Sequence, residues 1–287
     1  MLTRVVFVSP TPVLEELVAL VPDPGERSIT EGGYGQAIHV LADVPDPDAL
    51  RRRLRDAADH VTVAVITGPL ATRPAGLVLC DVDSTFTTTE ALDMLAEHAG
   101  HGAEVAAITE RAMRGEIDFA ESLRLRVSTV AGLPTRFLDD VRAAMTLSPG
   151  ALELVAAAHA QGARIGLTSG GFTQLIDPMA DEIGVDFVSA NVFETTTAAG
   201  TEVLTGRVVG GIVDRAQKAR DLARFAARYE VDPALTVAVG DGANDLDMLA
   251  AAGLGVAYCA KPVTAERADV AVGFPRLDAV IPLALDR

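Results

Sequence analysis

Asp81-Val82-Asp83-Ser84-Thr85 directly follows residues 76–80, an apolar run with the composition of a strand buried in a parallel sheet. Ligands of open α/β sheets bind beyond the carboxyl ends of the strands, which is where these two aspartates fall. One carboxylate there can act as a nucleophile while the other handles protons, although the two repel each other unless a cation or a function compensates. An ordinary acidic turn remains the alternative at this point.

Two further predicted strand ends carry polar residues. Residues 164–168 form a second apolar run, and Ser169-Gly170-Gly171 follows it before a helical stretch. A hydroxyl group and unhindered backbone N–H groups at the start of a helix can bind phosphate, although the same residues are common in loops. Residues 236–240 form a third apolar run that opens into Asp241-Gly242-Ala243-Asn244-Asp245. Carboxylates at that position are hard oxygen ligands suited to Mg²⁺.

The order and spacing of four motifs resemble the haloacid dehalogenase superfamily, and within it the phosphoserine phosphatases. The motifs are DVDST at 81–85, TSGG at 168–171, Lys218 near the start of a predicted helix, and GDGANDLDML at 240–249. A lone lysine on a helix is ordinarily a solvated charge, so Lys218 gains its significance from the other three motifs. The resemblance covers residues 76 to about 275. It implies an α/β fold, with a Rossmann-like parallel sheet of the haloacid dehalogenase type and an inserted helical cap.

The resemblance also implies roles for individual residues. Asp81 matches the nucleophile that forms an aspartyl-phosphate, and Asp83 matches the acid/base that protonates the leaving serine oxygen and later deprotonates water. Mg²⁺ is expected on the carboxylates of Asp81 and Asp241 and on the backbone carbonyl of Asp83. Asp245 resembles a carboxylate that orients Lys218 or metal-bound waters. Four residues are expected to bind the phosphoryl group: Ser169, Gly170, Lys218 and Asn244.

Substrate choice is expected to lie outside this shared centre. Glu90 and Arg126 match the residues that phosphoserine phosphatases use for the amino and carboxylate groups, and a guanidinium can bind a carboxylate through two hydrogen bonds. Phe119 lies seven residues before Arg126, on the same helix face, and resembles an apolar lid beside the substrate. The residues by themselves also allow a helix first-turn acid at Glu90, a surface arginine at Arg126 and a core side chain at Phe119.

The expected activity is therefore Mg²⁺-dependent hydrolysis of the small molecule O-phospho-L-serine to serine and phosphate, the last step of serine biosynthesis. One alternative is a related phosphatase or phosphotransferase that acts on another small phosphomonoester. Another is an amino-acid-sensing regulatory protein whose phosphatase core is vestigial. The intact Asp81, Asp83, Lys218 and Asp241 argue against the second alternative.

Composition excludes several other classes of protein. The chain has 287 residues, of which 49% are hydrophobic, enough for one large domain and a smaller one. No apolar stretch has the length of a membrane span and no secretion signal begins the chain, so a cytoplasmic enzyme without a membrane partner is expected. The formal net charge of −16 and the lack of a basic cluster argue against nucleic-acid binding. Cys80 and Cys259 are predicted to be core residues.

Residues 1–73 are predicted to form a separate unit joined by a linker at residues 71–74. The predicted order is strand 3–8, helix 12–21, weak strand 28–30, strand 36–41, helix 47–58 and strand 61–66. This βαββαβ order predicts a ferredoxin-like sandwich and resembles the amino-acid-sensing (ACT-like) domains attached to such phosphatases. However, Ser9-Pro10-Thr11-Pro12 lacks the glycine that those domains carry in the first turn. Effector binding, a homodimer formed through this unit and a purely structural role therefore remain open.

The remaining chain, residues 76–287, is predicted to be the catalytic core, with the cap inserted at residues 86–147. Helical spacing of apolar residues predicts cap helices at 89–98, 105–114, 118–129 and 134–145. Such a cap would close over the site and exclude water. A hairpin is predicted from residues 192–194 and 201–209.

Overall fold

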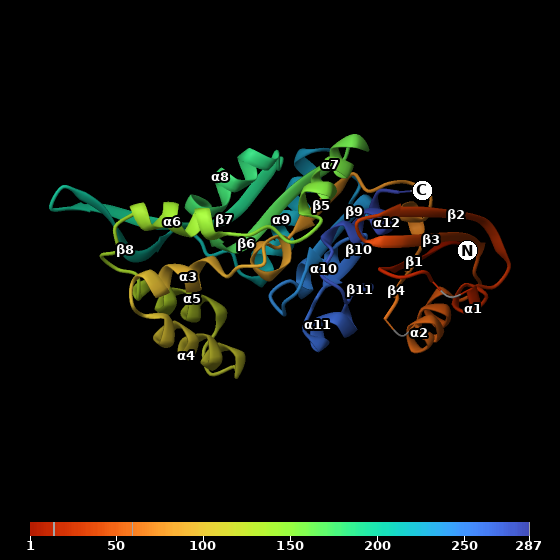
Figure 1. Ribbon diagram of the computed structural model, residues 1–287, viewed down its shortest axis with the longest axis horizontal. Coiled ribbons are helices and arrows are strands. Elements are labelled where there is room, and N and C mark those ends of the chain that lie inside the picture. The colour runs from red at the N-terminus through yellow and green to blue at the C-terminus, as the bar shows by residue number, and fades with distance from the viewer. Residues whose placement is uncertain (14, 59, 287) are drawn as a thin grey trace.

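A seven-stranded sheet forms the centre of the larger part of the computed structural model, which describes residues 1–13, 15–58 and 60–286 (Figure 1). The strand order is β11-β10-β9-β5-β6-β7-β8, and all neighbours are parallel except the antiparallel pair β7 and β8. The strands are β5 (Leu77–Cys80), β6 (Arg164–Phe172), β7 (Phe187–Ala198), β8 (Thr201–Val209), β9 (Thr236–Gly240), β10 (Leu254–Tyr258) and β11 (Val270–Val272). Because β5 pairs with both β6 and β9, the three strand ends singled out in the sequence are neighbours.

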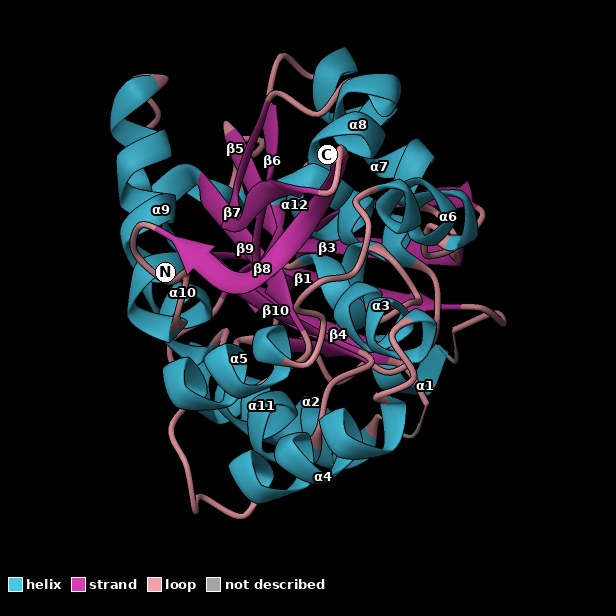
Figure 2. Cartoon of the chain, turned by 90° about the vertical axis from the view of Figure 1, so that its left-hand side faces the viewer, coloured by secondary structure: helices cyan, strands magenta, loops and turns pink. Residues whose placement is uncertain are grey.

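Helices cover both faces of this sheet (Figure 2). They are α7 (Ala151–Ala160), α8 (Thr173–Ile183), α9 (Arg215–Arg228), α10 (Leu246–Ala251), α11 (Pro262–Arg267) and α12 (Val280–Ala284). Alternate residues of β5 face opposite sides, as the two-residue period of a strand requires. Val78 and Cys80 pack with α7, α8 and α12, whereas Leu77 and Leu79 pack with α9 and α10. The predicted α/β class and Rossmann-like core are confirmed.

Four helices lie between β5 and α7: α3 (Ala91–His98), α4 (Gly102–Met113), α5 (Phe119–Ser128) and α6 (Arg136–Ala144). Each begins and ends within a few residues of a predicted helix. Leu95, Leu123 and Val141, from three of them, share an apolar core with Phe172 of β6 and Leu204 of β8. The β7–β8 hairpin extends away from the sheet and packs against α5 (Figure 1). The helical block is therefore anchored on the core by this hairpin.

The N-terminal residues form a second, four-stranded antiparallel sheet with the order β2-β3-β1-β4. Its elements are β1 (Leu2–Ser9), α1 (Glu15–Val18), β2 (Pro24–Gly32), β3 (Gly35–Asp43), α2 (Pro47–Ala57) and β4 (Thr62–Ile66). The predicted helix 12–21 is shorter than expected, and its residue 14 lies outside the described residues. Strand β2 is longer than the predicted 28–30. It is a polar, exposed edge strand, and its length is set by its pairing with β3, which no apolar pattern in its own sequence indicates.

Both faces of strand β1, at the centre of the N-terminal sheet, are buried. Val5 and Phe7 of β1 pack beneath α1 and α2, whereas Val6 and Val8 join the core that also contains Leu283 of α12. The predicted linker, residues 71–74, begins at the last residue of a short 3-10 helix, Gly68–Ala71, whose Leu70 and Ala71 are buried. The N-terminal sheet is thus packed on the larger part through a continuous apolar core.

One buried arginine reinforces this contact. Arg4 of β1 donates hydrogen bonds from Nη1 to the carbonyl oxygen of Asp286 at 2.6 Å and from Nη2 to that of Leu283 at 2.9 Å. Nη2 also donates to the carbonyl oxygen of Leu70 at 3.1 Å. A cation at the end of α12 satisfies carbonyl groups that the helix leaves unpaired.

The two cysteines differ. Cys80 is buried in β5 as predicted, but the prediction of a core position for Cys259 is wrong, since that side chain is exposed. Cys259 follows the last residue of β10 and has φ +44°, so the chain has already left the sheet there. Among the described residues, no helix is both long enough and apolar enough to span a membrane.

Candidate active site

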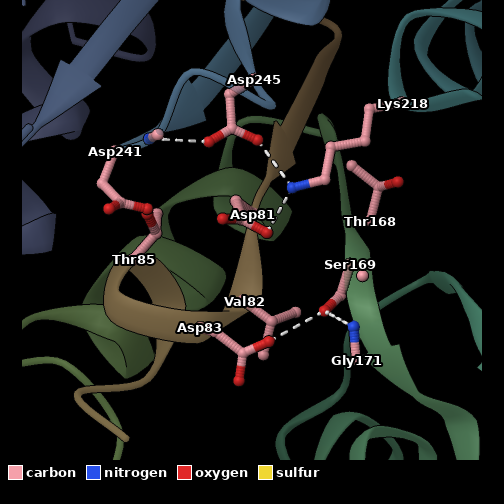
Figure 3. A network of polar contacts seen from close by, with 12 residues as sticks. Asp81, Val82, Asp83, Thr85, Thr168, Ser169, Gly171, Lys218, Asp241 and Asp245 are labelled. Atoms are coloured by element: carbon pink, nitrogen blue, oxygen red, sulfur yellow. Dashed lines mark hydrogen bonds and ion pairs between the residues drawn. The ribbon is translucent and has the colours of Figure 1, made fainter. Parts of the chain in front are cut away.

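Asp81, Ser169 and Asp241 lie together at the carboxyl ends of the three central strands, with Lys218 beside them (Figure 3). Asp81 is the first residue after β5, and Asp241 is the first after β9. Ser169 lies in β6, which pairs with β5. The backbone N–H of Asp81 donates to the carbonyl oxygen of Val239 at 2.9 Å, which fixes the chain where the side chain leaves the sheet.

Lys218 joins two of the acidic side chains. It lies in the first turn of α9, which begins where the Asp214 side chain accepts a hydrogen bond from the backbone of Gln217. Its Nζ lies 2.6 Å from Oδ1 of Asp81 and 2.6 Å from Oδ1 of Asp245. Burial alone would lower the pKa of Lys218, but the Asp245 and Asp81 carboxylates raise it above its ordinary value. The lysine is therefore a fixed positive charge.

Asp245 reaches this position because the backbone at Gly240 has no side chain. A Cβ on Gly240 would lie 2.5 Å from Cγ of Asp245, a clash that backbone movement alone could relieve. Oδ2 of Asp245 accepts a hydrogen bond from the backbone N–H of Gly242 at 3.0 Å. The two glycines of the GDG segment, Gly240 and Gly242, thus lie against the carboxylate of Asp245, which contacts Lys218.

Three carboxylates form an acidic cluster suited to a cation. Ligand oxygens of Asp81, Asp241 and Asp245 all lie within 4.8 Å of one another. Burial and the neighbouring Asp245 raise the pKa of Asp81, which Lys218 opposes, and burial and Asp245 raise that of Asp241 to about 6. Lys218 forms its ion pairs with Asp81 and Asp245, and the pKa of Asp241 stays raised although Lys218 and Lys261 oppose the rise. Carboxylate oxygens are the ligands that Mg²⁺ prefers. These residues fit a divalent cation.

Asp83 faces away from that cluster and toward the phosphate-binding motif. Its Oδ2 accepts a hydrogen bond from Oγ of Ser169 at 3.2 Å, and its Oδ1 accepts one from the backbone N–H of Ala91 at 3.3 Å. Burial, and secondarily the Glu90 carboxylate, raise the pKa of Asp83 to about 6. A carboxyl group with that pKa can both give and accept a proton near neutral pH.

The turn over Val82–Phe86 begins directly after Asp81 and contains Asp83. Ser84 has φ +59°, a left-handed conformation that costs a non-glycine residue free energy and is found at functional turns. Oγ1 of Thr85 donates to Oδ1 of Asp241 at 3.3 Å, and Oγ of Ser148 donates to the carbonyl oxygen of Thr85 at 2.7 Å. The sequence reasoning did not identify Thr85 or Ser148 as supports of this turn.

The Ser169-Gly170-Gly171 segment turns around the serine hydroxyl. Oγ of Ser169 accepts a hydrogen bond from the backbone N–H of Gly171 at 2.7 Å. A Cβ on Gly170 would lie 2.8 Å from Cζ of Phe119, so this glycine allows a ring from α5 to lie on the segment. Phe119 is accordingly placed beside the predicted phosphate position.

Of the other predicted substrate residues, Glu90 and Arg126 lie on the cap side of the site and Asn244 lies in the core. Glu90 immediately precedes α3, and its Oε1 accepts a hydrogen bond from Oγ of Ser84 at 2.8 Å. Arg126 lies on α5 with 16% of its side chain exposed, and its Nη1 is 3.9 Å from Oδ1 of Asp93. Asn244 is partly buried in the loop before α10, with Oδ1 against Gly242. Sequence reasoning missed Asp93, whose only signal is its position one helical turn after Glu90.

Comparison with known proteins identifies related chains. Residues 78–250 match the model of the haloacid dehalogenase-like hydrolase family. A phosphoserine phosphatase of Mycobacterium tuberculosis is 51% identical over 225 residues, covering 78% of this chain and 54% of that protein. A phosphoserine phosphatase of Streptococcus thermophilus is 45% identical over 208 residues, covering 72% of this chain and 95% of that protein. The chain therefore spans about half the length of the first relative and nearly all of the second.

A solved structure with a similar fold covers almost the whole chain. The crystal structure of a probable phosphoserine phosphatase from Vibrio cholerae superposes with a TM-score of 0.77 at 35% identity, covering 98% of this chain and 85% of the other. The family match includes all the strand-end motifs that form the candidate site. The chain belongs to the haloacid dehalogenase-like hydrolases.

Proposed function

We propose that the protein is a phosphoserine phosphatase, which hydrolyses O-phospho-L-serine to L-serine and phosphate through an aspartyl-phosphate on Asp81. The observation that carries this proposal is the 2.6 Å contact between Asp81 and Lys218 at the end of β5. It places a carboxylate beside a fixed positive charge, with Asp83 and Ser169 a short distance along the same edge of the sheet. Relatives named phosphoserine phosphatase support the choice of substrate.

The reaction has two steps on these residues. An oxygen of Asp81 attacks phosphorus, the bond between phosphorus and the serine oxygen breaks, and Asp83 gives its proton to that oxygen. Water then attacks phosphorus, the bond to Asp81 breaks, and Asp83 takes the proton that water releases. Lys218 offsets the negative charge shared by Asp81 and the phosphoryl oxygens. Ser169, the Gly170 N–H and Asn244 are proposed to hold those oxygens, since phosphoryl transfer depends mainly on positioning and charge.

Mg²⁺ is the proposed cofactor. Asp81 and Asp241 would hold it with the backbone carbonyl of Asp83, and Asp245 lies close enough to orient its waters. When bound, the ion would neutralise charge on the phosphoryl oxygens. Its net effect on the protein alone would be to relieve the repulsion among the three carboxylates.

Recognition of the serine part is assigned to the cap side of the site. Glu90 would bind the ammonium group of the substrate, and Arg126 would bind its carboxylate. Phe119 would lie over the bound phosphate from α5. A phosphomonoester without these two groups would lose both contacts and bind more weakly.

For the N-terminal unit, residues 1–73, we propose a ferredoxin-like, ACT-like domain attached to the catalytic core at 76–287 with its cap at 86–147. The order β1-α1-β2-β3-α2-β4 and the sheet order β2-β3-β1-β4 support this assignment. Homodimerisation through this unit is a further proposal, and the exposed edge of β2 is the surface available for it.

Phosphate release from a panel of phosphomonoesters tests the proposed function. The panel contains both enantiomers of O-phosphoserine, O-phosphoethanolamine and 3-phosphoglycerate, each with Mg²⁺ and with a chelator. The highest kcat/KM is expected for O-phospho-L-serine, with little turnover in chelator. A higher kcat/KM on a substrate that lacks the amino acid group would contradict the substrate assignment, and transfer of phosphate to an added alcohol in preference to water would contradict hydrolysis.

A further inference from the structure

Two buried polar atoms on the cap side of the site have no hydrogen-bond partner among the described residues. They are Oδ1 of Asp93 and Nε of Arg126. The two side chains approach each other only to 3.9 Å, between Oδ1 of Asp93 and Nη1 of Arg126, which is too long for a hydrogen bond. Buried polar groups of native proteins are nearly always paired, so an unpaired acceptor beside an unpaired donor points to a missing ligand.

The position of these atoms links them to the substrate. Asp93 lies in the first turn of α3, three residues after Glu90, which is the N-cap residue of that helix. Glu90 is tied to Ser84 of the turn that follows Asp81. Arg126 lies two turns after Phe119 on α5, and Cζ of Phe119 lies 2.8 Å from the position that a Cβ on Gly170 would take. Both orphaned atoms therefore belong to helix faces that reach the catalytic residues.

Negative charges outnumber positive ones around Asp93 and Arg126. Burial and the Glu90 and Glu97 carboxylates raise the pKa of Asp93, and Arg126 only partly opposes them. Asp93 therefore lies among carboxylates, with one guanidinium group beside it. A ligand carboxylate bound to Arg126 would add a further negative charge. A cationic group must accompany that carboxylate if the pocket is to bind it well.

We infer that Asp93, together with Glu90, binds the α-ammonium group of the substrate while Arg126 binds its carboxylate. The inference deepens the proposed function and rests on it. An amino acid carries an ammonium group, which donates hydrogen bonds, and a carboxylate, which accepts them, on the same carbon atom. The ammonium group fits the unpaired acceptor, Oδ1 of Asp93, and the carboxylate fits the unpaired donor, Nε of Arg126. One oxygen of Glu90 already accepts from Ser84, so a second carboxylate provides the acceptor that an ammonium group still needs.

Two other roles for Asp93 make different predictions. As an acid in the first turn of α3 it would stabilise the helix dipole, and its removal would lower stability without changing selectivity. As a group that only orients Arg126, it would affect all carboxylated substrates equally. Binding to the ammonium group affects only substrates that carry an amine.

The test compares O-phospho-L-serine with 3-phosphoglycerate, which has a hydroxyl group in place of the ammonium group and keeps the carboxylate. Asp93→Asn is expected to lower kcat/KM for phosphoserine about 10-fold, mainly through KM, because a charge-assisted contact is lost from a half-exposed side chain. The affinity for 3-phosphoglycerate, measured as KM or as an inhibition constant, is expected to stay the same or improve. Asp93→Glu should recover part of the phosphoserine loss.

Two matched variants complete the design. Glu104→Gln makes the same change of charge on an exposed residue of α4 in the same cap, and it should leave both ligands unaffected. Arg126→Ala should weaken phosphoserine and 3-phosphoglycerate together, since both carry the carboxylate.

Equal losses on both ligands in Asp93→Asn would overturn the inference in favour of a role in orienting Arg126. A change in melting temperature without a change in selectivity would overturn it in favour of the helix role. If the unaltered protein releases no phosphate from phosphoserine, the proposed function fails instead, and this result is read before any variant is compared.

Discussion

Lys218 of α9 contacts Asp81 at the end of β5, with 2.6 Å between Nζ and Oδ1. The lysine is fully buried, and its other carboxylate contact, to Asp245, has the same length. The pair therefore serves both the proposed chemistry and the packing of α9 against β5. Removing either partner leaves an uncompensated charge inside the protein.

Lys218→Met should abolish phosphoserine turnover and lower the free energy of unfolding by about 3–5 kcal/mol, because Asp81 and Asp245 then repel each other without a cation. Adding Asp245→Asn should recover much of the stability by removing one of the two charges, while activity stays absent. Denaturant unfolding and phosphate release measure the two effects. If Lys218→Met alone left the free energy of unfolding unchanged, the contact between Lys218 and Asp81 would contribute nothing to folding.

Asp83→Asn should lower kcat for phosphoserine by about 10²–10⁴-fold, because it removes the proton donor for the serine oxygen. With p-nitrophenyl phosphate, whose leaving group needs no proton, the first step should remain fast and the second slow. A burst of p-nitrophenolate in stopped-flow measurements is the expected sign. Asp140→Asn, an exposed residue of α6, serves as the control. Full activity in Asp83→Asn would remove the residue from the mechanism.

Arg4→Met should destabilise the whole chain, because the carbonyl groups of Leu70, Leu283 and Asp286 lose their donor inside the contact between the two sheets. The expected loss is about 2–4 kcal/mol in the free energy of unfolding. Arg52→Met on the exposed side of α2 is the matched control and should have little effect. A loss confined to the N-terminal sheet, with the catalytic core unfolding as before, would show that the two parts fold independently.

His39 should make stability depend on pH. Burial, and then the nearby Arg4 charge, lower the pKa of this β3 side chain from 6.5 to about 4. The unfolded chain therefore binds a proton more readily than the folded protein. The stability that this difference provides is present above pH 6.5 and is lost as pH falls toward about 4. The loss approaches about 3 kcal/mol.

The measurement is the free energy of unfolding between pH 7 and about 4, compared with that of His39→Gln. The variant should show a shallower dependence over this interval, since it has no imidazole to protonate. Parallel pH profiles for the two proteins would mean that His39 takes up its proton equally in both states.

The predictable part of the fold consists of elements whose sequence pattern agrees with their burial. Residues 236–240 form a strand with both faces covered, so an uninterrupted apolar run predicts its bounds. Strand β2 is polar because it lies at an exposed edge, and its extent depends on pairing with β3, which no local pattern encodes. Cys259 was misplaced because its neighbours in β10 are apolar, although the chain turns out of the sheet at that residue.

Some residues of the candidate site could likewise be predicted from the sequence, and others could not. Asp81, Asp83 and Asp241 were found because strand ends and acidic residues are both visible in the sequence. The contact between Lys218 and Asp245 follows from helix α9 packing beside β9, which the spacing of the motifs suggests but does not fix. Asp93 could not be found because an acid in the first turn of a helix is common, and its unpaired oxygen becomes apparent only when α5 brings Arg126 beside it.

Chemical trapping of the phosphorylated enzyme tests directly whether Asp81 is the nucleophile. The protein is mixed with O-phospho-L-serine and Mg²⁺, quenched during turnover and reduced with borohydride, which converts an aspartyl-phosphate to homoserine. Peptide mass analysis should then find homoserine at position 81, and at no other aspartate, with none in Asp81→Asn. Steady hydrolysis of phosphoserine with an unmodified Asp81, or with homoserine at a different position, would show that Asp81 does not form the aspartyl-phosphate.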